Sequence, residues 1–164
     1  MSPTVRDATA GDAARIAAIY NQAVAGGGAT MDEEPWTSDS VQARMLAQDD
    51  MEGFLVLEQD GRVLGWSEYK RYSPRAGYRF AGETATYLDR SVRGQGLGTR
   101  LKEAVIARCR AVGYHHLVAK VFADNTASVR YNLRLGYEVV GTQREIGRRG
   151  GRWIDIVILQ LILR

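Results

Sequence analysis

The chain has 164 residues, of which 45% are hydrophobic and 25% charged, and this composition is typical of a globular protein. Its length suits one domain with a substantial core, and we expect a single domain over residues 1–164. The net charge is only +3 and the two signs are interspersed, so the composition does not indicate nucleic-acid binding.

Neither a membrane protein nor a disulfide-stabilised secreted domain is indicated. The N-terminal stretch carries charges and has no apolar signal core, and the most apolar stretch, residues 154–163, is interrupted by Asp155 and Gln160. The single cysteine, Cys109, excludes an internal disulfide framework and fits a reducing cytoplasm, where we expect the protein to act. His and Cys residues nowhere have metal-ligand spacing, so we expect no metal.

The first half of the chain contains both helical and strand patterns. Thr9 and Asp12 have capping-box spacing before apolar residues at helical spacing, and the glycines at 26–28 end that helix. Asp60-Gly61 is a typical turn between the two strands of a β-hairpin. In chain order we expect a strand at 5–7, a helix that includes 16–23, a weaker helix at 38–47, and strands at 54–58 and 62–70.

The second half predicts a β-α-β crossover and a closing pair of strands. Apolar residues recur nearly once per turn from Leu97 to Val112, and Gly113 ends that helix. In chain order we expect a strand at 83–88, this helix, a strand at 117–122, a short helix at 127–135, and strands at 139–146 and 152–161 around a turn at 147–151. The arginines around that turn, among them Arg149, are expected to be solvated. The order of elements predicts a mixed α/β fold.

The most informative stretch is Arg93-Gly94-Gln95-Gly96-Leu97-Gly98, between a predicted strand and a predicted helix. Its alternating glycines let the backbone approach a ligand closely, and the free N–H groups of the following helix favour an anion. Such a junction binds phosphate groups, although a plain glycine-rich turn is the alternative. Gly98-Thr99-Arg100 lacks the lysine of a Walker loop, and the third glycine comes one residue early for the dinucleotide fingerprint.

Three pieces of the sequence agree in order and separation with one known family. They are the strand before the glycine loop, the loop itself, and the downstream run Asn125-Thr126-Ala127-Ser128 with Leu135-Gly136-Tyr137. Through them the chain resembles the Gcn5-related N-acetyltransferase (GNAT) superfamily over nearly its whole length. It is most similar to the phosphinothricin/methionine sulfoximine N-acetyltransferases, through Ile19-Tyr20-Asn21, Ala29-Thr30, Tyr78-Arg79, Tyr87 and Gly151-Arg152-Trp153-Ile154-Asp155. The resemblance implies a GNAT fold, α/β, with a single central, mostly antiparallel twisted sheet of about six to seven strands and about four helices.

The resemblance implies that acetyl-CoA is the cosubstrate. In the family the glycine loop cradles the pyrophosphate, the pantetheine lies along the preceding strand, and the downstream Asn lies near the pantetheine arm. The cofactor-binding residues implied for this chain are Thr86, Tyr87, Leu88, Arg93, Gly94, Gln95, Gly96, Leu97, Gly98, Asn125, Ser128 and Asn132. Asn125 and Ser128 also have a structural reading as a helix cap, which is compatible with cofactor contact. The subgroup further implies a homodimer, which the C-terminal hairpin helps to build.

Acetyl transfer from a thioester to an amine needs a free amine lone pair and a fate for the departing thiolate. Deprotonating an α-ammonium at neutral pH costs about 1 to 1.5 kcal/mol, within reach of one carboxylate. The subgroup has its catalytic glutamate at the position of Glu83, which we expect to be the base, and the alternative is an exposed carboxylate at a strand end. Backbone N–H groups around Leu88 would hold the oxyanion.

The position of the family's usual proton donor differs in this chain. Many superfamily members carry a tyrosine there, which can protonate the thiolate, whereas this chain has Asn132. We expect Asn132 to hydrogen-bond near the sulfur, with a solvated mid-helix asparagine as the alternative. The neighbouring Tyr131 is expected to belong to the core.

The expected acceptor is a small amino-acid-like amine, of the type of methionine sulfoximine, methionine sulfone or phosphinothricin. Tyr78 and Arg79 come just before Glu83, and a guanidinium can pair with a carboxylate, so they and Glu33 are candidate substrate-binding residues. Two other functions stay open: acetylation of a protein N-terminus or a polyamine, and a CoA-binding module without turnover. We expect neither nucleic-acid nor membrane partners.

Overall fold

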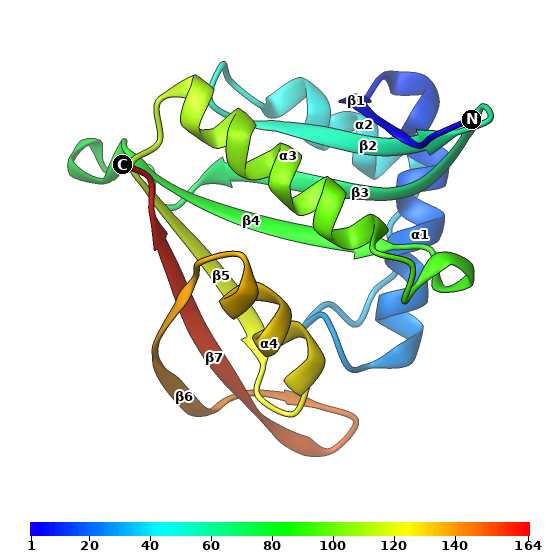
Figure 1. Cartoon of the computed structure of the whole chain (residues 1–164). Helices are drawn as coiled ribbons and strands as arrows, with labels where there is room; N and C mark the ends of the chain where they lie inside the picture. Colours follow the sequence, from blue (N-terminus) through cyan, green and yellow to red (C-terminus); the bar gives the residue numbers. More distant parts are fainter.

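The computed structural model describes residues 1–164, and its framework is one seven-stranded sheet with the strand order β1-β2-β3-β4-β5-β7-β6 (Figure 1). The strands are β1 (Thr4–Asp7), β2 (Gly53–Gln59), β3 (Arg62–Arg71), β4 (Ala81–Leu88), β5 (His116–Phe122), β6 (Glu138–Arg149) and β7 (Arg152–Ile162). The helices are α1 (Ala13–Gly26), α2 (Ser38–Ala47), α3 (Leu97–Val112) and α4 (Thr126–Arg134), with 3₁₀ turns η1 (Ala10–Asp12), η2 (Ala76–Tyr78) and η3 (Arg90–Val92). The expected α/β fold with a mostly antiparallel sheet and four helices is confirmed. None of the helices is both long and apolar enough to cross a membrane.

β4 and β5 are the only neighbouring strands that run parallel, and they pair over just three residues. The pairs are Ala81 with His116, Gly82 with Leu117 and Glu83 with Val118. Beyond them β4 stays paired with β3 as far as Leu88, and β5 stays paired with β7 as far as Phe122. Figure 1 shows the two strands diverging from their common end. The facing edges of residues 84–88 and 119–122 therefore have no strand partner, and their N–H and C=O groups need another one.

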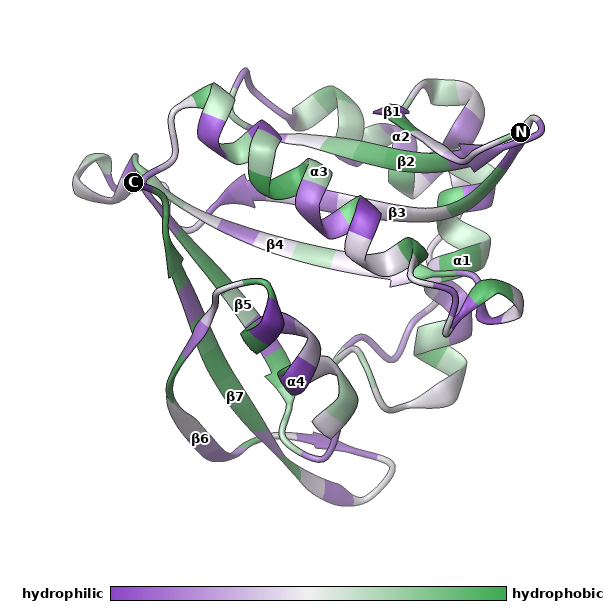
Figure 2. Cartoon of the chain, in the orientation of Figure 1, coloured by the Kyte–Doolittle hydropathy of each residue, from purple (hydrophilic) through white to green (hydrophobic).

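Helices cover both faces of the sheet. α3 packs on one, the α3 face, through the fully buried Leu101, Val105 and Cys109, and β7, one of the strands beneath this core, is largely apolar (Figure 2). α1 and α2 cover the opposite α1 face, where Tyr20 packs near Trp66. Because successive strand residues point to opposite faces, neighbouring residues of β4 serve different sides of the sheet.

Local signals place the element ends where the sequence predicts them. Thr9 and Asp12 form the capping box before α1, and Gly27 follows α1 with a left-handed φ of 72°. Asp60 and Gly61 both have positive φ, at 52° and 77°, as a two-residue hairpin turn requires. These ends are set by interactions within a few residues, which explains why sequence alone locates them.

The turn predicted at residues 147–151 is wrong in its length. β6 continues to Arg149, and only the two glycines that follow turn the chain. Gly147 lies within β6, where an added Cβ would come 2.2 Å from Cε of Met31. This glycine therefore reflects the close approach of a distant segment and not a turn.

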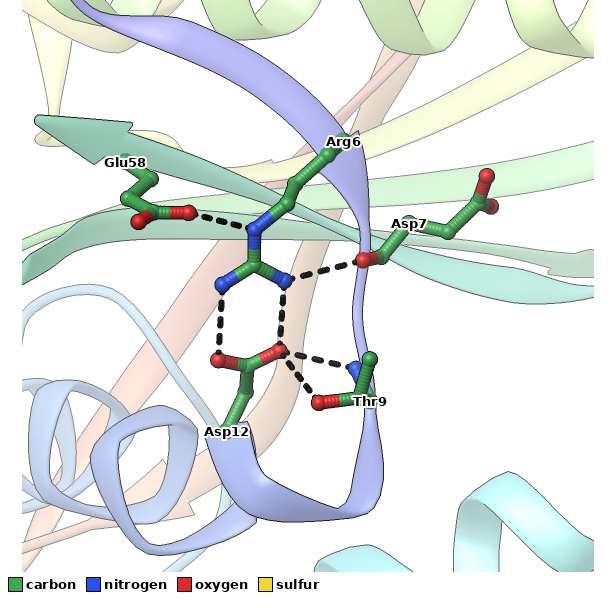
Figure 3. Close-up of polar contacts among 5 residues, drawn as sticks. All are labelled: Arg6, Asp7, Thr9, Asp12 and Glu58. Carbon is green, nitrogen blue, oxygen red and sulfur yellow. Dashed lines mark hydrogen bonds and ion pairs between the residues drawn. The ribbon is translucent and has the colours of Figure 1, made fainter. Parts of the chain in front are cut away.

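An arginine on β1 ties together three segments at one edge of the sheet (Figure 3). Nη1 and Nη2 of Arg6 donate to the two carboxylate oxygens of Asp12 at 2.8 and 3.0 Å, and Nε donates to Glu58 on β2. The Asp12 side chain is 10% exposed, and its hydrogen bonds with Arg6 lower the pKa of the carboxyl. The cluster fixes the start of α1 against β1 and β2.

Replacing Arg6 by methionine should lower the free energy of unfolding by about 1–2 kcal/mol at pH 7, because the largely buried Asp12 carboxylate loses its two-point partner. A carboxyl with a lowered pKa stabilises the fold above its ordinary range, and this contribution is lost as the pH falls through the lowered value. Urea unfolding should therefore show a difference at neutral pH that shrinks in acid. The exposed Arg130→Met variant is the control, and an equal loss in both variants would contradict a specific role of Arg6.

Candidate functional site

A cleft of about 720 Å³ opens where β4 and β5 diverge, and we call it the first cleft. The unpaired edges of Thr84–Leu88 and Ala119–Phe122 line it, the turn before α3 closes one end, and α4 forms a further wall. A ligand in this cleft would lie along backbone groups that otherwise have only water as a hydrogen-bond partner.

The turn before α3 presents backbone N–H groups to the first cleft. Gly94 and Gly96 have φ of 79° and 76°, a conformation that L side chains rarely adopt. Gly96 is the N-cap of the 16-residue helix α3 and no side chain caps this end, so the first N–H groups of α3 lack a side-chain partner. Arg93 lines the cleft beside them. The helix N-terminus and the guanidinium together can hold a diphosphate.

α4 contributes a buried amide with a free oxygen. Asn125 caps α4 by accepting a hydrogen bond from the Ser128 N–H at 3.2 Å. Asn132 is 4% exposed, its Nδ2 donates to the Ser128 carbonyl at 2.9 Å, and its Oδ1 has no partner. The solvated reading of Asn132 is therefore wrong. Because a buried acceptor without a partner costs about 1–3 kcal/mol, Oδ1 is suited to accept a hydrogen bond from a ligand.

Tyr131, expected in the core, is partly buried and lines the first cleft. Its hydroxyl donates to the carbonyl of Gly98, which joins α4 to the first turn of α3. Burial raises the pKa of this hydroxyl above its ordinary value. Tyr131 therefore holds two walls of the cleft together as a neutral group.

A second cleft of about 600 Å³ lies on the α1 face and meets the first cleft where the strands diverge. The residues that line both clefts are Ala29, Thr84, Ala85, Tyr87, Lys120 and Phe122. The charged residues of the second cleft carry both signs: Asp32, Glu68 and Glu83, and Arg44, Lys70 and Lys120. Its aromatic residues are Tyr20, Trp36, Trp66, Tyr87 and Phe122. The second cleft can therefore hold a small molecule that has both an ammonium and a carboxylate group.

Glu83 is the last residue of β4 that pairs with β5, which places it at the junction of the two clefts. Its Oε1 lies 3.3 Å from Nζ of Lys120, and its side chain is 21% exposed. Glu68 lines the same cleft from β3, and burial raises the pKa of its carboxyl while nearby Lys70 and Arg44 partly oppose that effect. The carboxylate at the junction itself is that of Glu83.

The β6–β7 hairpin holds the outer wall of the second cleft. Arg149, expected to be solvated, donates from Nη1 to the Thr30 carbonyl at 2.8 Å and from Nη2 to the Val24 carbonyl at 2.7 Å. The hydroxyl of Tyr20 lies 2.6 Å from Oγ1 of Thr30 and also donates to Asp32. The segment after α1 is therefore fixed from two sides, and the shape of the second cleft depends on the hairpin.

Residues 16–137, which include all the residues that line the first cleft, match the model of the Acetyltransferase (GNAT) family. The chain belongs to this family. The expected family is thus confirmed, and the protein is a GNAT-type acetyltransferase.

Similar proteins of known name agree with this assignment. The chain is 37% identical to an L-methionine sulfoximine/L-methionine sulfone acetyltransferase of Pseudomonas paraeruginosa, over 99% of this chain and 96% of the relative. It is 36% identical to a phosphinothricin N-acetyltransferase of Alcaligenes faecalis, over 96% of this chain and 81% of the relative. A Salmonella typhimurium protein solved with its cofactor acetyl-CoA superposes with a TM-score of 0.95 at 31% identity, covering 100% of this chain and 95% of that chain.

The structure brings most of the predicted cofactor residues of this acetyltransferase to the first cleft. Those that line it are Thr86, Tyr87, Leu88, Arg93, Gly94, Gly96, Gly98, Asn125, Ser128 and Asn132. Gln95 is exposed and Leu97 packs against the core, so neither side chain lines the cleft. Glu83 lines the second cleft.

The three predicted substrate residues line neither cleft of this chain. Tyr78 is 49% exposed, and Arg79 donates to a backbone carbonyl within its own turn at 3.0 Å. Glu33 is exposed on the segment before α2. Closeness to Glu83 in sequence therefore does not bring Tyr78 and Arg79 to the lining of the clefts.

Sequence reasoning missed several charged residues of the site. Two of them, Lys102 and Lys120, carry a charge among apolar neighbours, which was the signal in the sequence. Lys120 lies within the strand β5, and Lys102 lies on the stripe of α3 that also carries Val105 and Cys109. In an unaligned sequence such a charge can equally be solvated at the rim of a helix or strand. Only the packed structure shows that Lys102 is buried and that Lys120, although exposed, lines both clefts.

Lys102 is buried beside the first cleft without an ion pair. The residue is 3% exposed, its Nζ donates to Oγ1 of Thr84 at 2.8 Å, and the same atom lies 5.1 Å from the centre of the Tyr137 ring. Burial lowers the pKa of Lys102 from 10.5 to about 8. Because no carboxylate compensates its charge, the ammonium destabilises the folded protein.

Replacing Lys102 by methionine should raise the free energy of unfolding by about 3 kcal/mol at pH 7, because a pKa lowered from 10.5 to about 8 corresponds to a cost of this size. The unfolded chain binds the lysine proton up to a higher pH than the folded chain does. The cost is therefore complete below about pH 8 and disappears as the pH rises toward the ordinary value of 10.5. Urea unfolding of both proteins should show a stability gap that narrows with rising pH, and a constant gap would contradict a charged, unpaired Lys102.

Proposed function

We propose that this acetyltransferase uses acetyl-CoA to acetylate the α-amine of a small amino-acid-like compound, of the type of methionine sulfoximine, methionine sulfone or phosphinothricin. The observation that carries the proposal is the meeting of two clefts through the sheet, with Glu83 at their junction. One cleft ends in an anion-binding turn, and the other carries charges of both signs. The names of the relatives support the choice of acceptor.

The first cleft suits acetyl-CoA part by part. The turn at Gly94–Gly96 with Arg93 offers N–H groups and a positive charge to the diphosphate, and Gln95 and Leu97 would contribute through their backbone. The unpaired backbone of 86–88 can pair with the amide groups of the pantetheine arm, as an added strand would. Asn132 Oδ1 can accept a hydrogen bond from the same arm. A molecule bound in this way would carry its thioester toward the junction.

The second cleft suits an amino acid better than a polyamine. A polyamine carries only positive charge, whereas the three carboxylates of this cleft are balanced by three cationic side chains. An α-ammonium could approach Glu83 while an arginine or lysine holds the carboxylate of the same molecule. Freeing the α-ammonium of its proton at neutral pH costs about 1 to 1.5 kcal/mol, and Glu83 can accept this proton and pass it to solvent.

A homodimer remains part of the proposal. The β6–β7 hairpin exposes four large apolar side chains, those of Val139, Val140, Ile146 and Trp153, and a second copy that covered them would bury them. Ile146 also lines the second cleft, so such an interface would border the acceptor site. Contacts of Glu33, Tyr78 and Arg79 with the acceptor remain a prediction too, and in one chain these residues line neither cleft.

Release of free thiol from acetyl-CoA tests the proposed reaction with a panel of acceptors. The panel contains methionine sulfoximine, methionine sulfone, phosphinothricin, common amino acids, short peptides and spermidine. We expect turnover with the amino-acid-like compounds and little with peptides and spermidine. A peptide or polyamine as the preferred acceptor would replace the proposed one, and acetyl-CoA binding without any thiol release would favour a CoA-binding module.

Replacing Glu83 by glutamine should lower kcat/KM for the preferred acceptor by about 100-fold or more, because the amide cannot take up the ammonium proton. The pH profile should change as well, because without the base the rate follows only the fraction of the acceptor that is already a free amine in solution. Glu103→Gln, which changes an exposed glutamate of α3, is the matched control. Wild-type activity and pH profile in Glu83→Gln would rule out Glu83 as the base.

A further inference from the structure

The departing sulfur of the proposed reaction needs a proton. The α3 and α4 walls of the first cleft carry Thr99, Ser128 and Arg134, whose alcohols and guanidinium are too weakly acidic to supply it. Three further side chains of these walls are candidates. Asn132 cannot act as an acid, and its Nδ2 already donates to Ser128. The Tyr131 hydroxyl donates to the Gly98 carbonyl, and burial raises its pKa. Lys102 remains, and of the three N–H donors of its ammonium only one is used, by Thr84.

Lys102 lies next to the junction of the two clefts. It donates to Thr84, which lines both clefts and follows Glu83 in sequence. Because successive strand residues point to opposite faces, Lys102 approaches from the α3 face and Glu83 lies on the α1 face. An acetyl group held between the two clefts would therefore have its acceptor and base on one side and Lys102 on the other.

No anion of the folded chain pairs with Lys102. The titratable groups packed against it are Cys109 of α3 and Tyr137 after α4, and burial raises the pKa of each to about 12, so both are neutral. The carboxylate of Glu83 pairs instead with Lys120. A thiolate in the first cleft would be the first negative charge to reach the ammonium of Lys102, in surroundings where water screens little.

We propose that Lys102 is a catalytic residue that donates its proton to the sulfur as CoA leaves. This inference rests on the proposed function. The acceptor nitrogen forms a bond to the carbonyl carbon, the carbon–sulfur bond breaks with its electron pair on sulfur, and the ammonium gives that sulfur a proton. The nitrogen loses two protons as it changes from ammonium to amide, and both leave for solvent, one of them through Glu83. Lys102 regains one proton from solvent, so the whole reaction releases one proton.

The acidity of Lys102 suits this transfer. A free thiol has a pKa of about 8.5, close to the pKa of about 8 to which burial lowers Lys102, so a proton can move between them at little cost. An ordinary lysine is a much weaker acid than the thiol, and a proton on it would tend to stay there.

Calorimetric binding of CoA, desulfo-CoA and acetyl-CoA to the wild type and to Lys102→Met tests the inference, because only CoA has an ionisable thiol. For the wild type we expect CoA to release more protons on binding than desulfo-CoA does, and to bind about fivefold or more tightly at pH 8 than at pH 6.5, because Lys102 and the sulfur then share one proton. In Lys102→Met both differences should disappear, while the affinity for acetyl-CoA stays within about twofold. Its kcat should fall about tenfold or more at an unchanged KM for acetyl-CoA.

The outcomes separate this inference from the function on which it rests. If the wild type binds acetyl-CoA but releases equal protons with CoA and desulfo-CoA, Lys102 does not interact with the sulfur and the inference fails alone. If the wild type binds none of the three, the proposed function fails. Arg100→Met, on the same turn of α3 but exposed, is the control. A Lys102→Met variant that keeps the kcat of this control would also overturn the inference.

Discussion

The site depends on one constraint of the sheet: β4 and β5 can share only three residue pairs. Each strand is bound along its other edge to an antiparallel partner, β4 to β3 and β5 to β7, so the two halves of the sheet are fixed separately. Strand twist then carries the free ends of β4 and β5 apart. The backbone groups exposed in the gap must pair with water or a ligand, and a ligand with amide groups of its own can replace the missing strand. The first cleft therefore follows from the strand order and not from any single side chain.

Because β4 borders the gap between the two strands, its side chains reach a cleft on the α1 face and a cleft wall on the α3 face. Glu83 and Thr84 are neighbours in the chain, yet one faces the second cleft and the other accepts a hydrogen bond from Lys102 on the α3 face. Were Glu83 and Lys102 on one face, they would form an ion pair, and both charges would be less available to a substrate. The sheet keeps them apart, and Lys120, exposed at the mouth of the second cleft, pairs with Glu83 instead.

Features set by short-range interactions could be predicted from the sequence, and features set by distant contacts could not. The capping box at Thr9, the hairpin turn at Asp60 and the glycine turn before α3 depend on neighbouring residues, and each lies where the pattern places it. The prediction that Gly147 belongs to the turn was wrong. A small residue is needed there because Met31, more than a hundred residues away in the sequence, packs against it. Arg79 was a candidate because of its closeness to Glu83 in sequence, but its guanidinium bonds to its own turn, whereas the cations that line the second cleft come from α2, β3 and β5.

Lys102 lowers the stability of the folded chain, although the same buried ammonium can interact with a ligand in the first cleft. Its side chain occupies a position on α3 where the neighbours of the same stripe, Val105 and Cys109, are fully buried. An apolar side chain there would avoid a cost of about 3 kcal/mol, which is a large part of the roughly 5–15 kcal/mol that separates typical folded and unfolded states. Nothing in the packing requires a charge, since Thr84 and the Tyr137 ring accommodate the ammonium without neutralising it. Lys102 lowers the stability of the fold and lines the first cleft near the junction. Interaction with a ligand therefore explains this residue better than a structural role does.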